Sequence, residues 1–177
     1  MEYMDNSDIL GYIQGYQIFD KQIPETEIWN ILLQCLSALN YLNSLNYGNI
    51  GIKITNVFVN NTHNIKIGVF RDFIVNGQYY NPKEELDLLQ KYFHVMINSQ
   101  IFGIKELDNI SFIQNLNVQQ NVNNTYSNTL TNIIYNQFNG NVSELYKKVK
   151  EEYSKKYTKN TSIKAVLRCL SSYKLLT

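Results

Sequence analysis

The sequence predicts a mainly α fold, a helical bundle with a short β-hairpin, from three observations. Apolar residues recur at three- and four-residue steps over long segments, the spacing that gathers them on one face of a helix. Two short runs rich in β-branched and aromatic residues flank an Asn-rich cluster that favours a turn. The 177 residues are 44% hydrophobic, enough for one sizeable core and too few for two. We therefore expect residues 1–177 to form a single domain.

The first helix is expected to begin after Asp8. This residue precedes a group of apolar residues, and its carboxylate can accept hydrogen bonds from the free N–H groups of a first helical turn. The apolar residues that follow it are Ile9, Leu10, Ile13 and Ile18. The sequence thus predicts that Asp8 is a helix N-cap.

The longest helix is expected at residues 23–44. Pro24 suits a first turn, and Glu25 and Glu27 carry negative charge where the helix macrodipole is positive. Apolar residues cover most sides of this helix, so it should be buried among others. They are Ile28, Trp29, Ile31, Leu32, Leu33, Cys35, Leu36, Leu39 and Leu42.

The hairpin is expected from strands at Val57–Val59 and Ile65–Ile67, with a turn at residues 60–64 that carries His63 at its tip. A buried helix should follow at residues 85–99, because its apolar residues describe one face. These residues are Leu86, Leu89, Phe93, Met96 and Ile97.

Two more helices are expected in the last third of the chain. Residues 115–128 are dominated by Asn and Gln and are predicted to form a loop. A helix that buries Leu130, Ile133, Ile134 and Phe138 should follow and end near Gly140. The last helix, from Val142, carries Glu144 with Lys148, Glu151 with Lys155, and Glu152 with Lys156. Each acid stands four residues before its base, which predicts ion pairs along a solvated face.

The composition argues against several classes of partner. A net charge of +1 and a pI near 7.7 give no electrostatic attraction to nucleic acid or to an anionic membrane surface. No segment is long and apolar enough to span a membrane, and the N-terminus lacks the features of a signal peptide. Cys35 and Cys169 lie far apart and lack metal-ligand spacing, so reduced thiols and a cytoplasmic location are expected.

The segment at residues 49–56 resembles the catalytic loop of eukaryotic protein kinases. It reads Asn-Ile-Gly-Ile-Lys-Ile-Thr-Asn and aligns without a gap with the family pattern His-Arg-Asp-x-Lys-x-x-Asn. The two strands follow as in that family, and Val69-Phe70-Arg71 stands where the family has Asp-Phe-Gly. Residues 23–44 are most similar to the NIMA-related (NEK) branch of the serine/threonine kinases.

This resemblance implies the C-lobe of a protein kinase with the N-lobe absent. Residues 1–8 would be a remnant of the hinge between the lobes, and Met4 and Asp8 would be the residues nearest to a bound nucleotide. For Asp8 the helix cap is the preferred interpretation. Asp87 falls where the family has an Asp that holds the catalytic-loop backbone, and an exposed helical Asp is the alternative.

Two of the residues that the family needs for catalysis are replaced in this sequence. Phosphoryl transfer needs an Asp base and an Asp that binds Mg²⁺. Gly51 stands at the base position and has no side chain, while Val69 replaces the Asp ligand and cannot coordinate a hard cation. Lys53 and Asn56 match the phosphate-contacting Lys and the second metal ligand. The preferred alternative is that Lys53 is a surface lysine and Asn56 an amide that stabilises its loop.

We therefore expect a catalytically inactive, pseudokinase-like fragment that acts as a scaffold through protein–protein contacts and needs no cofactor. The alternative is a part of a serine/threonine protein kinase, truncated or split from its N-lobe, which would use ATP and Mg²⁺. A C-lobe without its N-lobe would expose an apolar surface near Tyr3, Met4 and Val69. Such a surface predicts a protein partner or self-association, with no role for nucleic acid or membrane.

Overall fold

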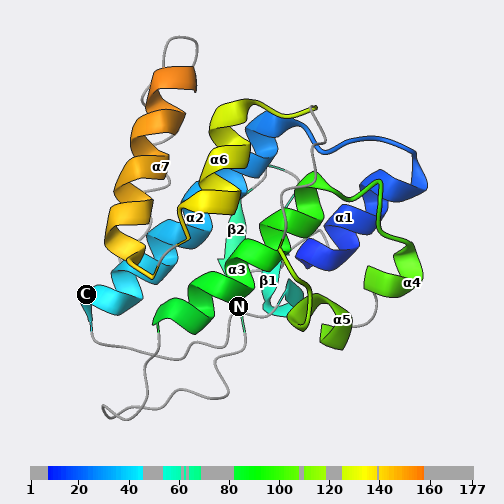
Figure 1. Ribbon diagram of the computed structural model, residues 1–177, viewed down its shortest axis with the longest axis horizontal. Coiled ribbons are helices and arrows are strands. Elements are labelled where there is room, and N and C mark those ends of the chain that lie inside the picture. The colour runs from blue at the N-terminus through cyan, green and yellow to red at the C-terminus, as the bar shows by residue number, and fades with distance from the viewer. Residues whose placement is uncertain are drawn as a thin grey trace.

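The computed structural model describes residues 8–45, 54–60, 62, 64–68, 82–107, 110–118, 125–138 and 140–157. Within them the chain is mostly helical and carries one two-stranded antiparallel hairpin, which confirms the mainly α fold class (Figure 1). In chain order the elements are α1 (Ile9–Ile18), α2 (Glu25–Ser44), the 3₁₀ helix η1 (Ile54–Asn56), β1 (Val57–Val59), β2 (Ile65–Ile67), α3 (Pro82–Ile97), α4 (Ile104–Leu107), α5 (Ile110–Gln114), α6 (Asn128–Asn136) and α7 (Val142–Tyr157).

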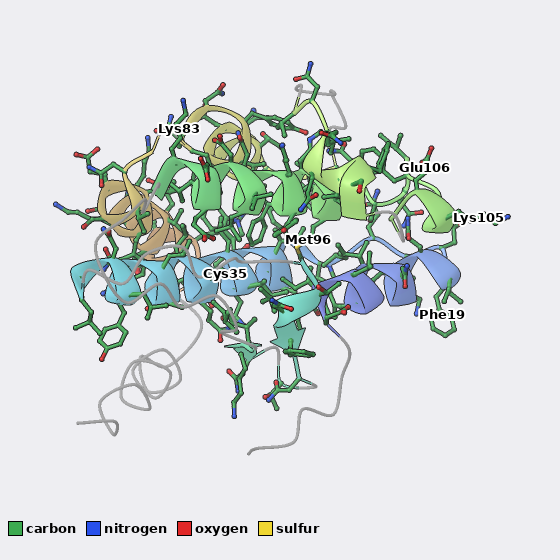
Figure 2. All side chains as sticks on the ribbon, turned by 90° about the horizontal axis from the view of Figure 1, so that it is seen from below. Phe19, Cys35, Lys83, Met96, Lys105 and Glu106 are labelled. Atoms are coloured by element: carbon green, nitrogen blue, oxygen red, sulfur yellow. The ribbon has the colours of Figure 1, made fainter. Side chains whose placement is uncertain are left out.

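Helix α2 is the centre of the arrangement. Figure 2 shows α2 lying between α3 on one side and the hairpin on the other, and both of these elements contact it. Helix α7 packs along α2, α6 packs on α3, and α1 contacts η1 and β1 (Figure 1). The hairpin is therefore held against the helical layer through both α1 and α2.

The core is built on the apolar faces of α2 and α3, as the periodicity predicts. The α2 side chains that are fully buried are Ile28, Trp29, Ile31, Leu32, Cys35, Leu36 and Leu39. On α3 all five predicted core residues are buried, at 5% exposure or less. Because each large apolar side chain removed from water contributes about 1.5–3 kcal/mol, these two faces supply much of the driving force for folding.

The first helix begins as the sequence predicts. The Asp8 carboxylate accepts a hydrogen bond from the Gly11 amide at 2.9 Å, which confirms the N-cap. Ile9 and Ile13 are fully buried, whereas Ile18 at the helix end is 67% exposed. The apolar group that follows Asp8 is thus divided between the core and the surface.

The hairpin has the predicted strands, with Val57 opposite Ile67 and Val59 opposite Ile65. Its turn is organised by one side chain, since Asn60 Oδ1 accepts hydrogen bonds from the amides of Thr62 and Asn64 at 3.0 and 2.9 Å. An Asn side chain that replaces a backbone acceptor is a common turn device, and it explains the Asn-rich composition there. His63 lies outside the described residues.

Several predicted boundaries need correction. The long helix begins at Glu25, with Pro24 in extended backbone as its cap, and the helix predicted at residues 85–99 runs from Pro82 to Ile97. The predicted loop at residues 115–128 is one residue too long, because Asn128 already belongs to α6, and residues 119–124 lie outside the described residues. Helices α4 and α5, of four and five residues, were not predicted because they are too short to show a period.

Two of the three predicted ion pairs of α7 are wrong in their partners, and in the third Glu151 acts on Lys155 only as a nearby charge, behind Glu152. Lys148 donates to the Gln137 side chain at 2.7 Å, and Lys155 pairs with Glu152, three residues before it, at 2.6 Å. The Lys156 side chain pairs with Glu25, which lies on another helix, at the start of α2. Tertiary packing of α7 on α2 brings that distant carboxylate within reach, and this overrides the local spacing rule.

Candidate functional site

The predicted site residues fall into two groups. Met4, Gly51, Lys53 and Val69 lie outside the described residues, so their roles stay predictions. Asp8 and Asn56 are described, and both lie at the base of the hairpin. The geometry of the candidate site is therefore built from these two residues and their neighbours.

Asn56 is the last residue of η1 and stands directly before β1. Its carbonyl accepts a hydrogen bond from the Gly68 amide at 2.7 Å, which joins the start of one strand to the end of the other. The residue is half-buried. Gly68 directly precedes Val69, so the backbone of Asn56 is tied to the segment that carries the predicted metal-ligand position.

Asp8 is engaged through both its side chain and its backbone. The carboxylate caps α1, and the backbone pairs with Phe58 of β1 in an isolated antiparallel bridge. The start of α1 is thus attached to the hairpin at the strand that follows Asn56. The cap prediction is confirmed, while a contact between Asp8 and a nucleotide stays a prediction.

Gly68 lies in close contact with the ring of Phe58. A Cβ added at Gly68 would stand 2.9 Å from Phe58 Cε2, closer than a real Cβ approaches another atom, so any other residue would push the ring aside. Asp8, Asn56, Phe58 and Gly68 together form what we call the hairpin base. It is a compact structural joint, and Gly68 directly precedes the predicted metal-ligand position Val69 in the chain.

The hairpin base offers one carboxylate and one amide as polar side chains, and the carboxylate already accepts the cap hydrogen bond. Carboxylate and amide oxygens are suitable ligands for Mg²⁺. Among the described residues there is no group of three or more His, Cys, Asp or Glu side chains able to hold a metal ion. Asp87, predicted to support the catalytic loop, is half-buried on α3.

A cluster with a perturbed carboxyl group lies elsewhere, at a junction of three helices. Glu25 at the start of α2 accepts hydrogen bonds from the Ser127 amide at 2.9 Å, the Ser127 hydroxyl at 2.5 Å and the Trp29 indole at 2.9 Å, and it pairs with Lys156 of α7. Burial alone would raise the pKa of the Glu25 carboxyl. The hydrogen bonds from Lys156, Ser127 and Trp29 outweigh it and lower that pKa to about 2.

A second polar cluster is buried between α3 and α6. His94 Nδ1 lies 3.1 Å from the Tyr135 hydroxyl, and Asn98 Nδ2 donates to that hydroxyl at 3.0 Å and to the His94 carbonyl at 2.9 Å. His94 and Asn98 are 2% and 1% exposed. Burial lowers the pKa of the His94 imidazole below its usual value.

A third cluster joins α1 to α2. The hydroxyls of Tyr12 and Tyr16 both donate to Glu27 Oε2, the second at 2.8 Å. Burial and the neighbouring Glu27 carboxylate raise the pKa of both tyrosines. Perturbed groups of this kind are candidates for function only when they gather in a cleft, and ion-pair networks that hold helices together perturb pKa values equally well.

No local pattern predicts the first two clusters. Glu25 and Ser127 are 102 positions apart, and His94 and Tyr135 are 41 positions apart, so neither pair belongs to one helix or hairpin. All three clusters join helices to one another, and none includes a residue of the hairpin base. We therefore infer that these three clusters stabilise the fold, and we keep the hairpin base as the candidate site.

One shallow depression of about 520 Å³ lies at α5, lined by Ser111, Phe112, Asn115, Leu116 and Asn117. Its lining contains no titratable side chain, so it offers no group for acid–base chemistry. Among the described helices, none combines the length and the apolar character needed to cross a bilayer.

Comparison with known proteins gives a partial similarity to a kinase. No family model matches the chain. A protein described as "Class II receptor tyrosine kinase" from Geodia cydonium is 35% identical over 77 residues, which cover 40% of this chain. The chain spans only 13% of the length of that relative. A kinase-like relation over part of the chain is what this similarity supports, and the NEK branch stays a prediction from the sequence.

Proposed function

We propose that this chain is a kinase-like protein that acts through protein–protein contacts without transferring phosphate. The observation that carries the proposal is the pair of residues Gly51 and Val69, which stand where a kinase needs its base and its metal-binding Asp. The similarity to a receptor tyrosine kinase supports the kinase-like relation on which this alignment depends.

The energetic consequence of the two replacements is large. Loss of a general base alone slows a reaction by roughly 10²- to 10⁴-fold, or about 3–5 kcal/mol of barrier. Val69 also offers no oxygen to Mg²⁺, which in kinases neutralises the charge that develops on the transferred phosphoryl group. The two losses fall on separate catalytic functions, so neither can compensate for the other.

The hairpin base, which ends one residue before Val69 in the chain, is nevertheless well connected. Asn56 and Gly68 are joined by a backbone hydrogen bond, and Phe58 is joined to Asp8 and packs against Gly68. A scaffold needs ordered backbone and does not need catalytic carboxylates, so an intact hairpin base supports a binding role. A cytoplasmic location belongs to the same proposal, and the free, buried thiol of Cys35 is compatible with it.

A second candidate function is nucleotide-dependent phosphoryl transfer as part of a serine/threonine kinase of the NEK type. Lys53 and Asn56 favour it, because they match the phosphate-contacting Lys and a metal ligand of the family pattern. Asn56 is half-buried at the hairpin base. If it binds ATP and Mg²⁺, the nucleotide must stabilise the fold by mass action, by about 2.7 kcal/mol at a hundredfold excess over the dissociation constant.

The deciding experiment measures phosphate transfer to a generic acceptor and the thermal shift with ATP and Mg²⁺. We expect the wild-type chain to give no transfer above the protein-free control. Lys53→Ala is the test variant, and Lys147→Ala, on the exposed face of α7, is the matched control. Transfer that disappears in Lys53→Ala and persists in Lys147→Ala would overturn the proposal and establish the kinase alternative.

A thermal shift without transfer has a separate meaning. A nucleotide-dependent rise in Tm that Lys53→Ala removes would show that the chain binds nucleotide as a non-catalytic ligand. The non-catalytic proposal would then stand, with nucleotide added as a ligand.

A further inference from the structure

Two large apolar side chains are exposed at the end of α2. Tyr41 and Leu45 are 45% and 46% exposed, and they stand four positions apart, so they form one ridge. We call these two residues the α2-end ridge. The Leu45 amide donates to the Tyr41 carbonyl at 3.3 Å, and the Ser44 hydroxyl donates to the same carbonyl at 2.6 Å. A ridge whose backbone is already ordered loses little conformational entropy when another segment covers it.

Helix α7 runs antiparallel to α2 and ends beside its beginning. Lys156, near the end of α7, pairs with Glu25 at the start of α2, and the two helices pack on each other (Figure 1). The chain that continues from Tyr157 therefore departs beside the beginning of α2. From Glu25 to Tyr41 the helix α2 measures about 24 Å, at 1.5 Å per residue.

Residues 158–177 follow α7 and lie outside the described residues, and their sequence carries a helical pattern of its own. After Ser162, a residue type that favours a helix start, apolar residues recur at three- and four-residue steps. They are Ile163, Val166, Leu167, Leu170 and Tyr173. Lys164, Arg168 and Ser172 fall on the opposite side of such a helix. The sequence therefore predicts an amphipathic helix whose apolar face needs a surface to cover.

The short connection after α7 selects the surface that this helix can reach. Only residues 158–162 separate α7 from the apolar pattern, and helices joined by so short a connection pack as antiparallel neighbours. A helix antiparallel to α7 points toward the end of α2. Over residues 163–176 it would extend about 20 Å. The connection, at up to about 3.3 Å per residue, supplies the remaining distance to Tyr41.

We propose that the α2-end ridge is a docking site for this chain's own residues 163–176, which pack as a helix along α7 and cover Tyr41 and Leu45 with their apolar face. Because a short connection ties this segment to α7, its effective concentration at the ridge is about millimolar. A separate partner of similar affinity would have to exceed that concentration to displace it. The inference goes beyond the proposed non-catalytic function, because it concerns which segment occupies the ridge, whether or not phosphate is transferred.

The test uses a nitroxide spin label on Cys169, which belongs to the docking segment. The other cysteine, Cys35, is fully buried, and burial raises the pKa of its thiol to about 12, so it stays protonated and out of reach of the reagent. Mass spectrometry checks that each chain carries one label. In the full, isotope-labelled chain the nitroxide should broaden the amide signals of Tyr41 and Leu45, and reduction with ascorbate should restore them. Phe19, which is 72% exposed at the opposite end of the molecule, should keep its signal (Figure 2).

Two substitutions in the docking segment separate its faces. Leu170→Asp places a charge in the centre of the predicted apolar face and should abolish the broadening of Tyr41 and Leu45, because that charge would have to be buried. Ser172→Asp adds the same charge on the opposite side of the helix, so it is the matched control and should keep the broadening. Circular dichroism checks that both variants are folded.

Each outcome decides the inference. Unchanged signals of Tyr41 and Leu45 in the labelled wild-type chain overturn it, as does broadening that survives Leu170→Asp or that Ser172→Asp also removes. A mixture of isotope-labelled chains without nitroxide and spin-labelled chains without isotope distinguishes the chain's own segment from that of a second copy. Broadening in this mixture overturns the inference, since a neighbouring copy then supplies the segment. None of these signals depends on phosphate transfer, so the proposed function stands or falls separately.

Discussion

At the scale of single residues, burial in the cluster of His94, Asn98 and Tyr135 favours the neutral imidazole. Asn98 Nδ2 donates to the Tyr135 hydroxyl, and His94 Nδ1 lies 3.1 Å from the same hydroxyl. In the tautomer in which Tyr135 donates to Nδ1, the imidazole carries its proton on Nε2. Burial thus lowers the pKa of His94 below its usual value.

This geometry predicts a pH dependence of stability near neutrality. The unfolded chain binds a proton at His94 near pH 6.5, and the folded chain binds it only at lower pH, so the free energy of unfolding falls as the pH drops below about 6.5. The contribution of one such group is at most about 1.4 kcal/mol per pH unit. Urea unfolding at pH 7.5, 6.5 and 5.5 measures this slope.

The other histidine provides the control for that experiment. His63→Gln should keep the slope below pH 6.5, because His63 is expected at the tip of the hairpin turn, away from the core. His94→Gln should flatten it. An equal slope in the wild-type chain and in His94→Gln would show that the buried imidazole is not its source.

At the scale of elements, the junction at Glu25 holds three helices with one carboxylate. Glu25 opens α2, Ser127 caps α6 and Lys156 closes α7. The Lys156 side chain is 36% exposed, so its ion pair is screened by water and contributes little by itself. The less exposed hydrogen bonds from Ser127 and Trp29 should carry most of the effect.

Glu25→Gln tests this junction. The amide keeps the size of the side chain but loses the charge and one acceptor, so we expect the free energy of unfolding to fall by about 1–3 kcal/mol. For a chain of this length each kcal/mol corresponds to about 2–4 °C in Tm. Glu144→Gln, on the exposed face of α7, is the control and should stay within about 0.5 kcal/mol. Equal losses in the free energy of unfolding for the two substitutions would show that Glu25 has no special role in holding the three helices together.

At the scale of the whole molecule, the perturbed groups predict a dome-shaped stability curve. On the acid side, His94 lowers the free energy of unfolding as the pH drops below about 6.5. Glu25, whose pKa is lowered to about 2, stabilises the fold above about pH 4.3, and this contribution is lost as the pH falls toward 2. On the alkaline side, burial raises the pKa of Cys35, Tyr126 and Tyr157 to about 12.

The Cys35 thiol and the Tyr126 and Tyr157 hydroxyls ionise at higher pH in the folded chain than in the unfolded chain. Their contribution to the stability of the fold is therefore complete below their unfolded pKa values and is lost as the pH rises toward 12. Thermal unfolding by circular dichroism from pH 2 to about 11 should give the highest Tm between about pH 7 and 8.5. A Tm that is constant from pH 7 to 5 would contradict the assignment of His94, and a Tm that is constant from pH 4 to 2 would contradict that of Glu25.

The parts of the fold that were predictable are those that a local pattern encodes. Helices α2, α3, α6 and α7 carry long apolar periods, and the hairpin carries β-rich runs around an Asn turn, so each was found within a few residues. The four- and five-residue helices α4 and α5 carry no period and were missed.

Long-range contacts explain what local patterns could not predict. Helix spacing predicts Glu152 as the partner of Lys156, but the packing of α7 on α2 places Glu25, 131 positions away, within reach. At the candidate site, the cap by Asp8 was predictable from its position before an apolar run, whereas its backbone pairing with Phe58 was not. Gly51, Lys53 and Val69 remain predictions from the kinase resemblance.

The helix junction at Glu25 also contains the single tryptophan of the chain. Trp29 is fully buried, and its indole N–H is donated to the carboxylate that Ser127 and Lys156 share. Its intrinsic fluorescence therefore reports on one defined place. Any detachment of the last helix or of the α6 cap would change the emission of this indole, so the integrity of the junction can be followed in real time without an added label.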